Sequence, residues 1–209
     1  MKTYHAPPDR SGKEELLKQR SSLESIAFLK ELINAFPYIV LILNENRQIL
    51  HSNDSLIKQI EVKDFQEFLG KAHGEVLKCV NSKNNELVCG TSEKCRYCGS
   101  VNSILTSLKD DRIVSDEFRM IAEHDGMKVA YDYLVTSCPF RWKEEGFLIF
   151  TLTDISFRNR HRMLERIFFH DILNTAGNIR GLSELILQIE DRGKKEDLLK
   201  TIGNLSLEI

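Results

Sequence analysis

The stretch from Phe168 to Ile189 places the strongest constraint on what this chain can fold into. Its apolar residues recur at alternating intervals of four and three, with Thr175 filling one gap, and this spacing is a heptad repeat. A heptad repeat predicts a helix that buries one narrow seam against other helices. With Ile172 at position a, His170 falls at position f, the point farthest from the seam. The pattern therefore predicts a packed helix that holds an exposed histidine.

A long helical hairpin is expected around this stretch. No proline interrupts residues 157–190, and the charged segment RNRHRMLER near their start is typical of a solvated connecting helix. Asp191-Arg192-Gly193 predicts a turn, after which two helices would run antiparallel as neighbours. Because one hairpin leaves its seam half covered, we expect two copies to close a four-helix bundle as a homodimer. The second helix is predicted from apolar residues spaced 4, 3 and 4 apart: Leu198, Ile202, Leu205 and Ile209.

Composition and charge exclude several classes of protein. The 209 residues suffice for one or two domains, and a net charge of −2 gives no sign of a nucleic-acid-binding surface. The longest apolar run, residues 38–43, is far shorter than the about 20 residues that a membrane span needs. The N-terminus has no apolar secretion signal. We therefore expect a cytoplasmic protein whose five cysteines are thiols or metal ligands, not a disulfide framework.

The N-terminal residues divide into a tail and a helix. Residues 1–12 contain Pro7, Pro8 and Gly12 and are expected to form a disordered tail. Residues 13–36 carry apolar side chains at intervals of three, four and seven, which predicts a helix that Pro37 ends. This helix either packs on its own domain or serves to dimerise, and the spacing alone does not choose between these two roles.

The segment from residue 37 to residue 156 alternates between strand and helix patterns. Two strands are expected first, then several short helices broken near Val62 and at Gly70, then a helix around residues 101–108, and finally three strands. Turns are expected at residues 44–46, 124–126 and 143–146. The strand-like runs are residues 38–43, 48–52, 113–122, 128–137 and 147–153.

This order of elements resembles a PAS domain over roughly residues 24–156. The likeness is carried by the order, by the opening FPYIVLILNENRQILHSN and by the closing GFLIFTLTDIS. It implies an α+β fold, a five-stranded antiparallel sheet with helices over one face and a pocket between them. Phe150 and Tyr133 are the expected walls of that pocket. PAS domains usually sense a ligand, a cofactor or a redox state, or simply dimerise.

The hairpin resembles the dimerisation and histidine-phosphotransfer domain of sensor histidine kinases. The likeness is carried by H-D-x-x-N within ERIFFHDILNTAGNIRGL. It implies that His170 takes the γ-phosphoryl group of ATP and passes it to an aspartate of a response-regulator receiver domain. Asp171 would orient the imidazole and accept its proton, and Asn174 would help to position water when the regulator is dephosphorylated. Gly177, again at position f, is expected to leave room for that partner.

Two further expectations accompany this resemblance. The sequence contains no glycine-rich nucleotide motif and stops at Ile209, so we expect a fragment without the ATP-binding domain. This fragment should be inactive alone. ATP would reach His170 only through the missing domain. The competing interpretation is a non-catalytic PAS dimerisation or adaptor module in which His170 is inert.

A cysteine-rich loop, residues 79–98, is the second candidate site. Four of its thiols are spaced x9, x5 and x2, and four thiolates can saturate a tetrahedral Zn²⁺ or hold an iron–sulfur cluster. Reduced thiols or two reversible disulfides are the alternatives. His73 is the histidine that can replace a cysteine ligand, whereas Cys138 stands apart and is expected to be a packed thiol. The candidate ligands are Cys79, Cys89, Cys95 and Cys98.

Overall fold

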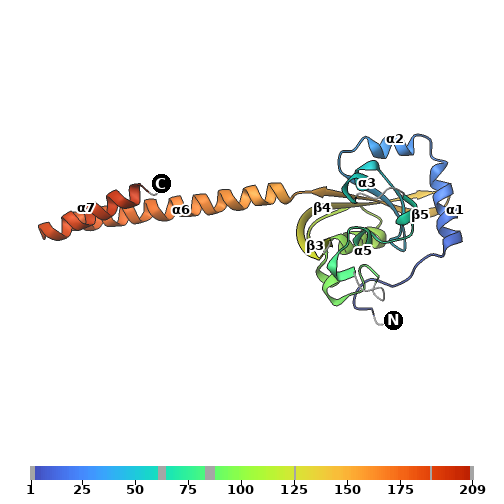
Figure 1. Ribbon diagram of the computed structural model, residues 1–209, viewed down its shortest axis with the longest axis horizontal. Helices are drawn as coiled ribbons and strands as arrows, with labels where there is room; N and C mark the ends of the chain where they lie inside the picture. The colour runs from blue at the N-terminus through green and yellow to red at the C-terminus, as the bar shows by residue number, and fades with distance from the viewer. Residues whose placement is uncertain (1–2, 61–64, 83–87, 125, 189, 208–209) are drawn as a thin grey trace. The chain divides into compact units, whose positions relative to one another are not determined.

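The computed structural model describes residues 3–60, 65–82, 88–124, 126–188 and 190–207. The chain separates into two compact units, Met1–Ser156 and Phe157–Ile209. Each unit is built around its own apolar contacts, a sheet covered by helices in the first and a helical hairpin in the second (Figure 1).

The first unit is built on a five-stranded antiparallel sheet with the order β2-β1-β5-β4-β3 (Figure 1). This confirms the predicted strand number and direction. β4 runs well past the predicted end at Ser137, because it pairs with β5 as far as Trp142 opposite Glu145. The strands are β1 Ile39–Asn44, β2 Ile49–Ser52, β3 Val114–His124, β4 Met127–Trp142 and β5 Glu145–Asp154.

Both faces of the sheet are apolar near its centre, because alternate residues of a strand point to opposite faces. Leu41 and Phe150 face the larger core, which short helices and the helix α5 (Gly99–Asp110) close through residues such as Ile104. Ile42 and Phe147 face the opposite side and pack against α1. The short helices are α3 Asp54–Ile60, η1 Phe65–Glu67, α4 His73–Val76, η2 Val80–Ser82 and η3 Glu93–Tyr97.

Two of the predicted turn positions fall partly outside the described residues. The expected break near Val62 and the centre of the expected turn at Asp125 belong to this group. The break at Gly70 is described, and its φ of +76° lies in the left-handed region that glycine adopts without strain. Gly70 therefore separates η1 from α4, as the sequence predicts.

The structure corrects the prediction of a disordered N-terminal tail. The described part of residues 1–12 packs on the domain. The backbone N–H groups of Tyr4 and Ala6 donate to the carbonyls of Thr91 and Gly90, at 3.1 and 3.0 Å, and Ala6 is fully buried. Arg47 donates to the carbonyl of Pro7. The prolines, which suggested a loose tail, instead hold an extended segment that pairs with the cysteine-rich loop.

The structure also corrects the prediction of a single helix over residues 13–36. It has two helices there, α1 Lys13–Glu24 and α2 Leu29–Asn34. Phe28, with φ of +60°, is left-handed and breaks the helical path between them. The apolar spacing continues across this break, so it could not reveal the turn. α1 buries Leu16 and Leu23 against the sheet, and this favours packing over dimerisation for that helix.

Trp142 has a structural role that its position in a turn did not suggest. The residue ends β4, and its Nε1–H donates to the carbonyl of Ser22 in α1 at 3.1 Å. The indole therefore ties α1 to the sheet.

The second unit is a helical hairpin of α6 Ser156–Gln188 and α7 Arg192–Ser206. The helices meet earlier than the predicted turn at residues 191–193, because α7 already begins at Arg192, where Asp191 caps it by accepting the N–H of Lys194 at 3.0 Å. None of the described helices is long and apolar enough to cross a membrane. The half-buried seam follows the heptad: Ile172, Thr175, Ile179, Leu182 and Ile186 on α6, and Leu198, Ile202 and Leu205 on α7.

Candidate functional site

His170, Asp171 and Asn174 lie together on the exposed side of α6. The side chains of His170 and Asp171 are 70% and 71% exposed, whereas Ile172, the next seam residue, is half-buried. The Nδ1 atom of His170 is 3.3 Å from Oδ1 of Asp171. The Nδ2 atom of Asn174, one turn later, is 3.1 Å from Nδ1 and 3.2 Å from Nε2 of the same ring. The helix thus groups an imidazole, a carboxylate and an amide in open solvent.

The contact with Asp171 favours one tautomer of the imidazole. A carboxylate only accepts hydrogen bonds, so Asp171 pairs with an Nδ1 that carries the proton. Nε2 then keeps its lone pair, while the amide of Asn174 lies within reach of both ring nitrogens. An exposed ring held by a carboxylate at one nitrogen presents the other nitrogen as a nucleophile.

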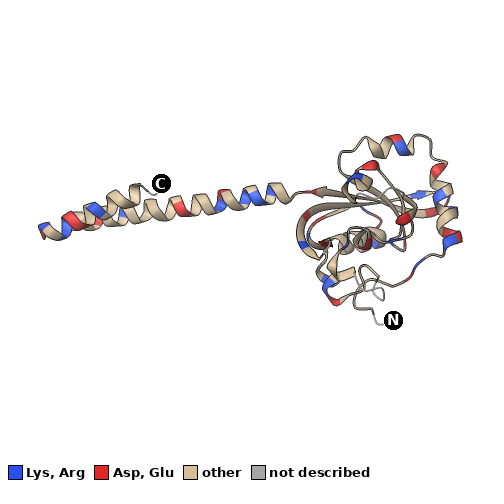
Figure 2. Ribbon diagram, viewed as in Figure 1, with Lys and Arg blue, Asp and Glu red and all other residues tan. Residues whose placement is uncertain are grey.

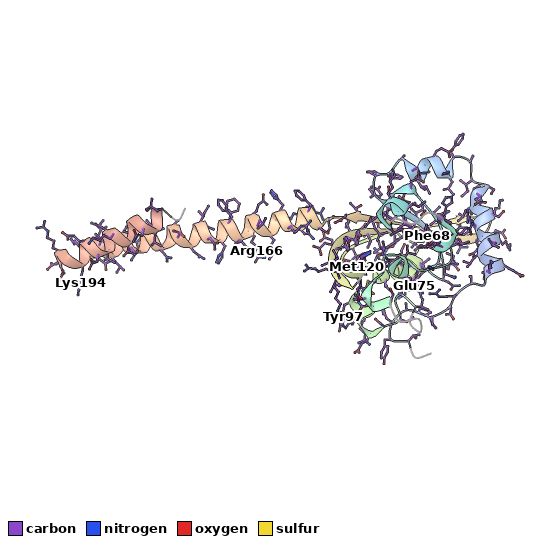
Figure 3. All side chains as sticks on the ribbon, viewed as in Figure 1. Phe68, Glu75, Tyr97, Met120, Arg166 and Lys194 are labelled. Atoms are coloured by element: carbon purple, nitrogen blue, oxygen red, sulfur yellow. The ribbon has the colours of Figure 1, made fainter. Side chains whose placement is uncertain are left out.

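The helix surface around His170 is cationic and apolar at once. Every residue from 160 to 171 is exposed, and arginines recur along the first half of α6 (Figure 2). Phe168 and Phe169 are 58% and 60% exposed. Figure 3 shows the side chains around Arg166 extending away from the helix on its different sides. Such an exposed surface suits contact with another domain.

Gly177 lies two turns beyond His170 on the same face. A Cβ atom at Gly177 would meet nothing within 4 Å, and the same holds for Gly181. Packing within the described chain therefore does not require glycine at either position.

The four cysteines of the loop line one small cavity in the first unit. Its volume is about 30 Å³, and Phe118 and Met120 of β3 form part of its wall. Cys95 lies in η3 and Cys98 follows it as the N-cap of α5, with the N–H of Cys98 donating to the carbonyl of Cys95 at 3.1 Å. We name Cys79, Cys89, Cys95 and Cys98 the cysteine cluster.

Burial sets the protonation of these thiols. It raises the pKa of Cys79, raises that of Cys98 to about 11, and raises that of Cys89 well above its ordinary value. A negative charge on a neighbouring cysteine would act in the same direction. As free thiols these three are protonated at neutral pH and are weak nucleophiles.

Backbone N–H groups oppose this effect at three sulfurs. They donate to sulfur and lower the thiol pKa, as hydrogen bonds to the charged form do. The donors are Asn81 and Ser82 for Cys79, Gly74 for Cys89, and Ser100 and Val101 for Cys98.

His73 lies in the wall of the same cavity, which the sequence pattern did not establish. Its Nε2 atom is 2.6 Å from Oγ of Ser100 and 4.0 Å from Sγ of Cys89. Its Nδ1 atom is buried without a hydrogen-bond partner. Burial, reinforced by the positive charge of Arg47, lowers the pKa of His73 to about 4, so the ring is neutral at physiological pH. Its position before the loop, at the start of a helix, was the available signal.

The four thiols line the same cavity, but they do not surround a single metal position. Among the described residues, no three His, Cys, Asp or Glu side chains stand close enough to share one metal ion as they are placed. All five cysteines are free thiols in this structure. Cys138 lies apart from the cluster on β4 and is half-buried, as expected of a packed thiol.

The structure corrects the prediction that Phe150 and Tyr133 line a pocket. Phe150 and Tyr133 are fully buried within the main core, where Tyr133 contacts Gln59 through its hydroxyl at 2.7 Å. Their rings fill the space between sheet and helices. A groove of about 540 Å³ lies elsewhere, where Phe28, His51 and residues of α1, α2 and α3 meet.

Five antiparallel strands with helices across the sheet are the architecture that the resemblance to PAS domains implies. The fold is that of a PAS domain. No family model matches the sequence. No curated protein matches it either.

Solved structures similar to this PAS-domain chain include other PAS domains. The PAS domain of nitrogen regulation protein NR(II) from Vibrio parahaemolyticus is 13% identical, with a TM-score of 0.41 over 62% of this chain and 100% of that one. The PAS domain of BvgS from Bordetella pertussis is 18% identical, with a TM-score of 0.43 over 68% and 98%. The LOV protein of Rhodobacter sphaeroides is 9% identical, with a TM-score of 0.44 over 94% and 97%. The assignment of the PAS fold therefore depends on the sheet topology and not on these scores.

Proposed function

We propose that this chain is the sensory and phospho-acceptor part of a two-component sensor histidine kinase. His170 accepts the γ-phosphoryl group of ATP through an ATP-binding domain and passes it to an aspartate of a receiver domain. Asp171 holds the Nδ1 proton, and Asn174 orients water at the same site during dephosphorylation of the regulator. The chain then acts in the cytoplasm, where ATP and receiver domains are present.

One observation carries the proposal. An imidazole that is 70% exposed stands beside a carboxylate and an amide, on the helix face opposite a heptad seam. Phosphoryl transfer depends mainly on alignment and charge stabilisation, so an open face that a catalytic domain and then a receiver domain can reach is suitable. The cationic side chains along the first half of α6 favour the approach of anionic groups (Figure 2).

A homodimer is part of the proposal. The seam residues of α6 and α7 are only half-buried within one hairpin, and Phe168 is 58% exposed. A groove of about 510 Å³ between the two helices is lined by Leu182, Leu185 and Leu205 together with Gly177 and Gly181. A second hairpin would cover these apolar groups and complete a four-helix bundle.

The PAS domain supplies the sensory input in this proposal. β5 ends at Asp154, and α6 begins at Ser156, so the strand is joined to the phospho-acceptor helix by one residue. A change in packing around β5 would rotate the start of α6 and alter how His170 meets the kinase domain. This coupling is argued from continuity of the chain.

The test is phosphorylation in trans. The chain is incubated with labelled ATP and a kinase-competent, full-length copy whose own phospho-acceptor has been replaced. We expect acid-labile label on wild-type chain and none on His170→Gln. His161→Gln removes another exposed histidine of α6 and is the matched control, which should be labelled as wild type is.

The competing function is a PAS adaptor module whose histidine is inert. Absence of label on the wild-type chain, with a kinase domain shown separately to label an unaltered full-length copy, would establish the adaptor and reject the phospho-acceptor. Label that persists in His170→Gln would place the acceptor elsewhere.

A further inference from the structure

The cysteine cluster is built into the packing of the first unit. Its four thiols line one cavity of about 30 Å³. A Cβ atom at Gly74 would lie 2.6 Å from Sγ of Cys89 and 3.6 Å from Cβ of Cys79, so glycine is what admits the sulfur there. The N-terminal segment pairs with the loop at Gly90 and Thr91 and fixes it from outside. Apolar side chains would fill such a site as well, so this collection of thiols calls for a chemical reason.

Polar groups that face the sulfurs give that reason. The Oγ atom of Ser92 lies 3.1 Å from Sγ of Cys95, and Nε2 of His73 lies 4.0 Å from Sγ of Cys89. A thiol is a weak acceptor, whereas a metal-bound thiolate carries charge that neighbouring donors stabilise and orient. The cavity therefore already holds partners for thiolates beside its four sulfurs.

The size and lining of the cavity select the ligand. A volume of about 30 Å³ accommodates a single small ion. Among the described residues of the lining, sulfur donors predominate and no carboxylate is present. Thiolate ligands select soft or borderline cations such as Zn²⁺ over Mg²⁺ and Ca²⁺.

We propose that the cysteine cluster binds one thiophilic divalent cation through four thiolates in a tetrahedral arrangement. Binding forms four metal–sulfur bonds and releases the four S–H protons to solvent. The sulfurs must turn inward from their present positions, since no three described donors yet share one point. Cys79 and Cys98 are only half-buried, which leaves their side chains room to turn.

His73 stays outside the ligand set in this proposal. Its Nε2 atom is already engaged with Ser100 at 2.6 Å, while Cys89 lies 4.0 Å away. The imidazole therefore stands behind Cys89 as a positioning residue. The site extends the proposed function by giving the sensor an input, but it does not depend on phosphorylation of His170.

The experiment is a Zn²⁺ titration of the reduced, metal-stripped full chain against a chromophoric chelator, with metal content measured afterwards. We expect one Zn²⁺ per chain. Serine at any cluster position should weaken binding by more than about tenfold, because loss of an outer hydrogen-bond partner alone costs about 10–100-fold. Cys138→Ser is the matched control and should bind as wild type does. His73→Gln should still bind one Zn²⁺, with weaker affinity.

A second measurement needs no variant and is independent of folding defects. Wild-type chain is treated with iodoacetamide with and without Zn²⁺, and alkylated cysteines are located by mass spectrometry. Protection of the four cluster thiols, but not of Cys138, supports the site. Equal alkylation in both samples overturns it. Bound iron with acid-labile sulfide overturns the single-ion assignment, and loss of Zn²⁺ in Cys138→Ser or retention in Cys89→Ser overturns the ligand set. Failure here would leave the labelling of His170 unchanged, so the two proposals fail separately.

Discussion

The imidazole ring of His73 packs against the phenyl ring of Phe150, with the ring centroids 5.0 Å apart. Phe150 belongs to β5, the strand that precedes α6 in the chain. His73 also lines the cavity of the cysteine cluster. One buried ring therefore contacts both the candidate metal site and the strand that leads to the phospho-acceptor helix.

The buried, neutral state of His73 makes stability depend on pH. Burial lowers its pKa from 6.5 to about 4, so the unfolded chain gains a proton as the pH falls through 6.5 while the folded chain does not until about pH 4. Stability from this group is complete above pH 6.5 and is lost as the pH falls towards 4. We expect the free energy of unfolding of the metal-free chain, from urea titrations, to be about 2 kcal/mol lower at about pH 4.5 than at pH 7 on account of this group.

The contribution of His73 is isolated by comparing variants. His73→Gln should flatten this pH dependence even if its stability at pH 7 is reduced. His161→Gln, at an exposed position, should retain the wild-type slope. An unchanged slope in His73→Gln would assign the acid sensitivity to other groups.

Asn53 joins the N-terminal helices to the first strand, and its removal should be costly. The side chain is fully buried; Nδ2 donates to the carbonyls of Ile33 and Tyr38 at 3.2 and 2.8 Å, and Oδ1 accepts the N–H of Val40 at 3.0 Å. Asn53→Ala leaves these buried groups unpaired, which we expect to lower the free energy of unfolding by about 3 kcal/mol. Asn46→Ala, at a half-buried turn residue with one side-chain bond to Ser11, is the comparison and should cost less than half as much. Equal losses in urea titrations would contradict this role.

The heptad was the most informative pattern in the sequence because the hairpin's packing is local. Residues spaced three and four apart meet the neighbouring helix whatever the rest of the chain does, and Ile172, Ile179 and Ile186 are the half-buried positions that the repeat predicts. The five strands were predictable for a similar reason, since alternation and turn residues are local signals.

What sequence reasoning missed depends on contacts between distant residues. The break at Phe28 lies inside an unbroken apolar spacing, so the spacing could not reveal it. Pro7 and Pro8 suggested a free tail, although backbone pairing with the cysteine-rich loop holds that segment. His73 was singled out in the sequence as a substitute ligand, but its contacts with Ser100 and Phe150 arise only through folding. The residues around His170 could be predicted because they lie on one helix. The residues that line the cysteine cavity could not all be predicted, because they come from distant segments of the chain.

Gly177 should be required by a partner and not by this chain. A Cβ atom there meets nothing within 4 Å, so Gly177→Ala should raise helix stability by up to about 1 kcal/mol, seen as a higher melting temperature of the hairpin. Because Gly177 shares the face of His170, we expect phosphorylation of His170 to persist while transfer to a receiver domain slows. Gly203→Ala in α7 also meets nothing within 4 Å and should stabilise without affecting transfer. Unimpaired transfer in Gly177→Ala would remove the glycine from the proposed docking surface.

The phase of α6 should control the output of the kinase. One residue inserted after Arg158 turns the rest of the helix by about 100°, whereas seven inserted residues restore the phase to within about 20°. Because β5 is joined to α6 by one residue, the single insertion changes which face of His170 meets the catalytic domain for a given state of the PAS domain. We expect the single insertion, in a kinase-competent protein, to change autophosphorylation of His170 severalfold, and the seven-residue insertion to leave it near wild type. Kinase output that is the same for both insertions would show that the PAS domain does not signal through rotation of this helix.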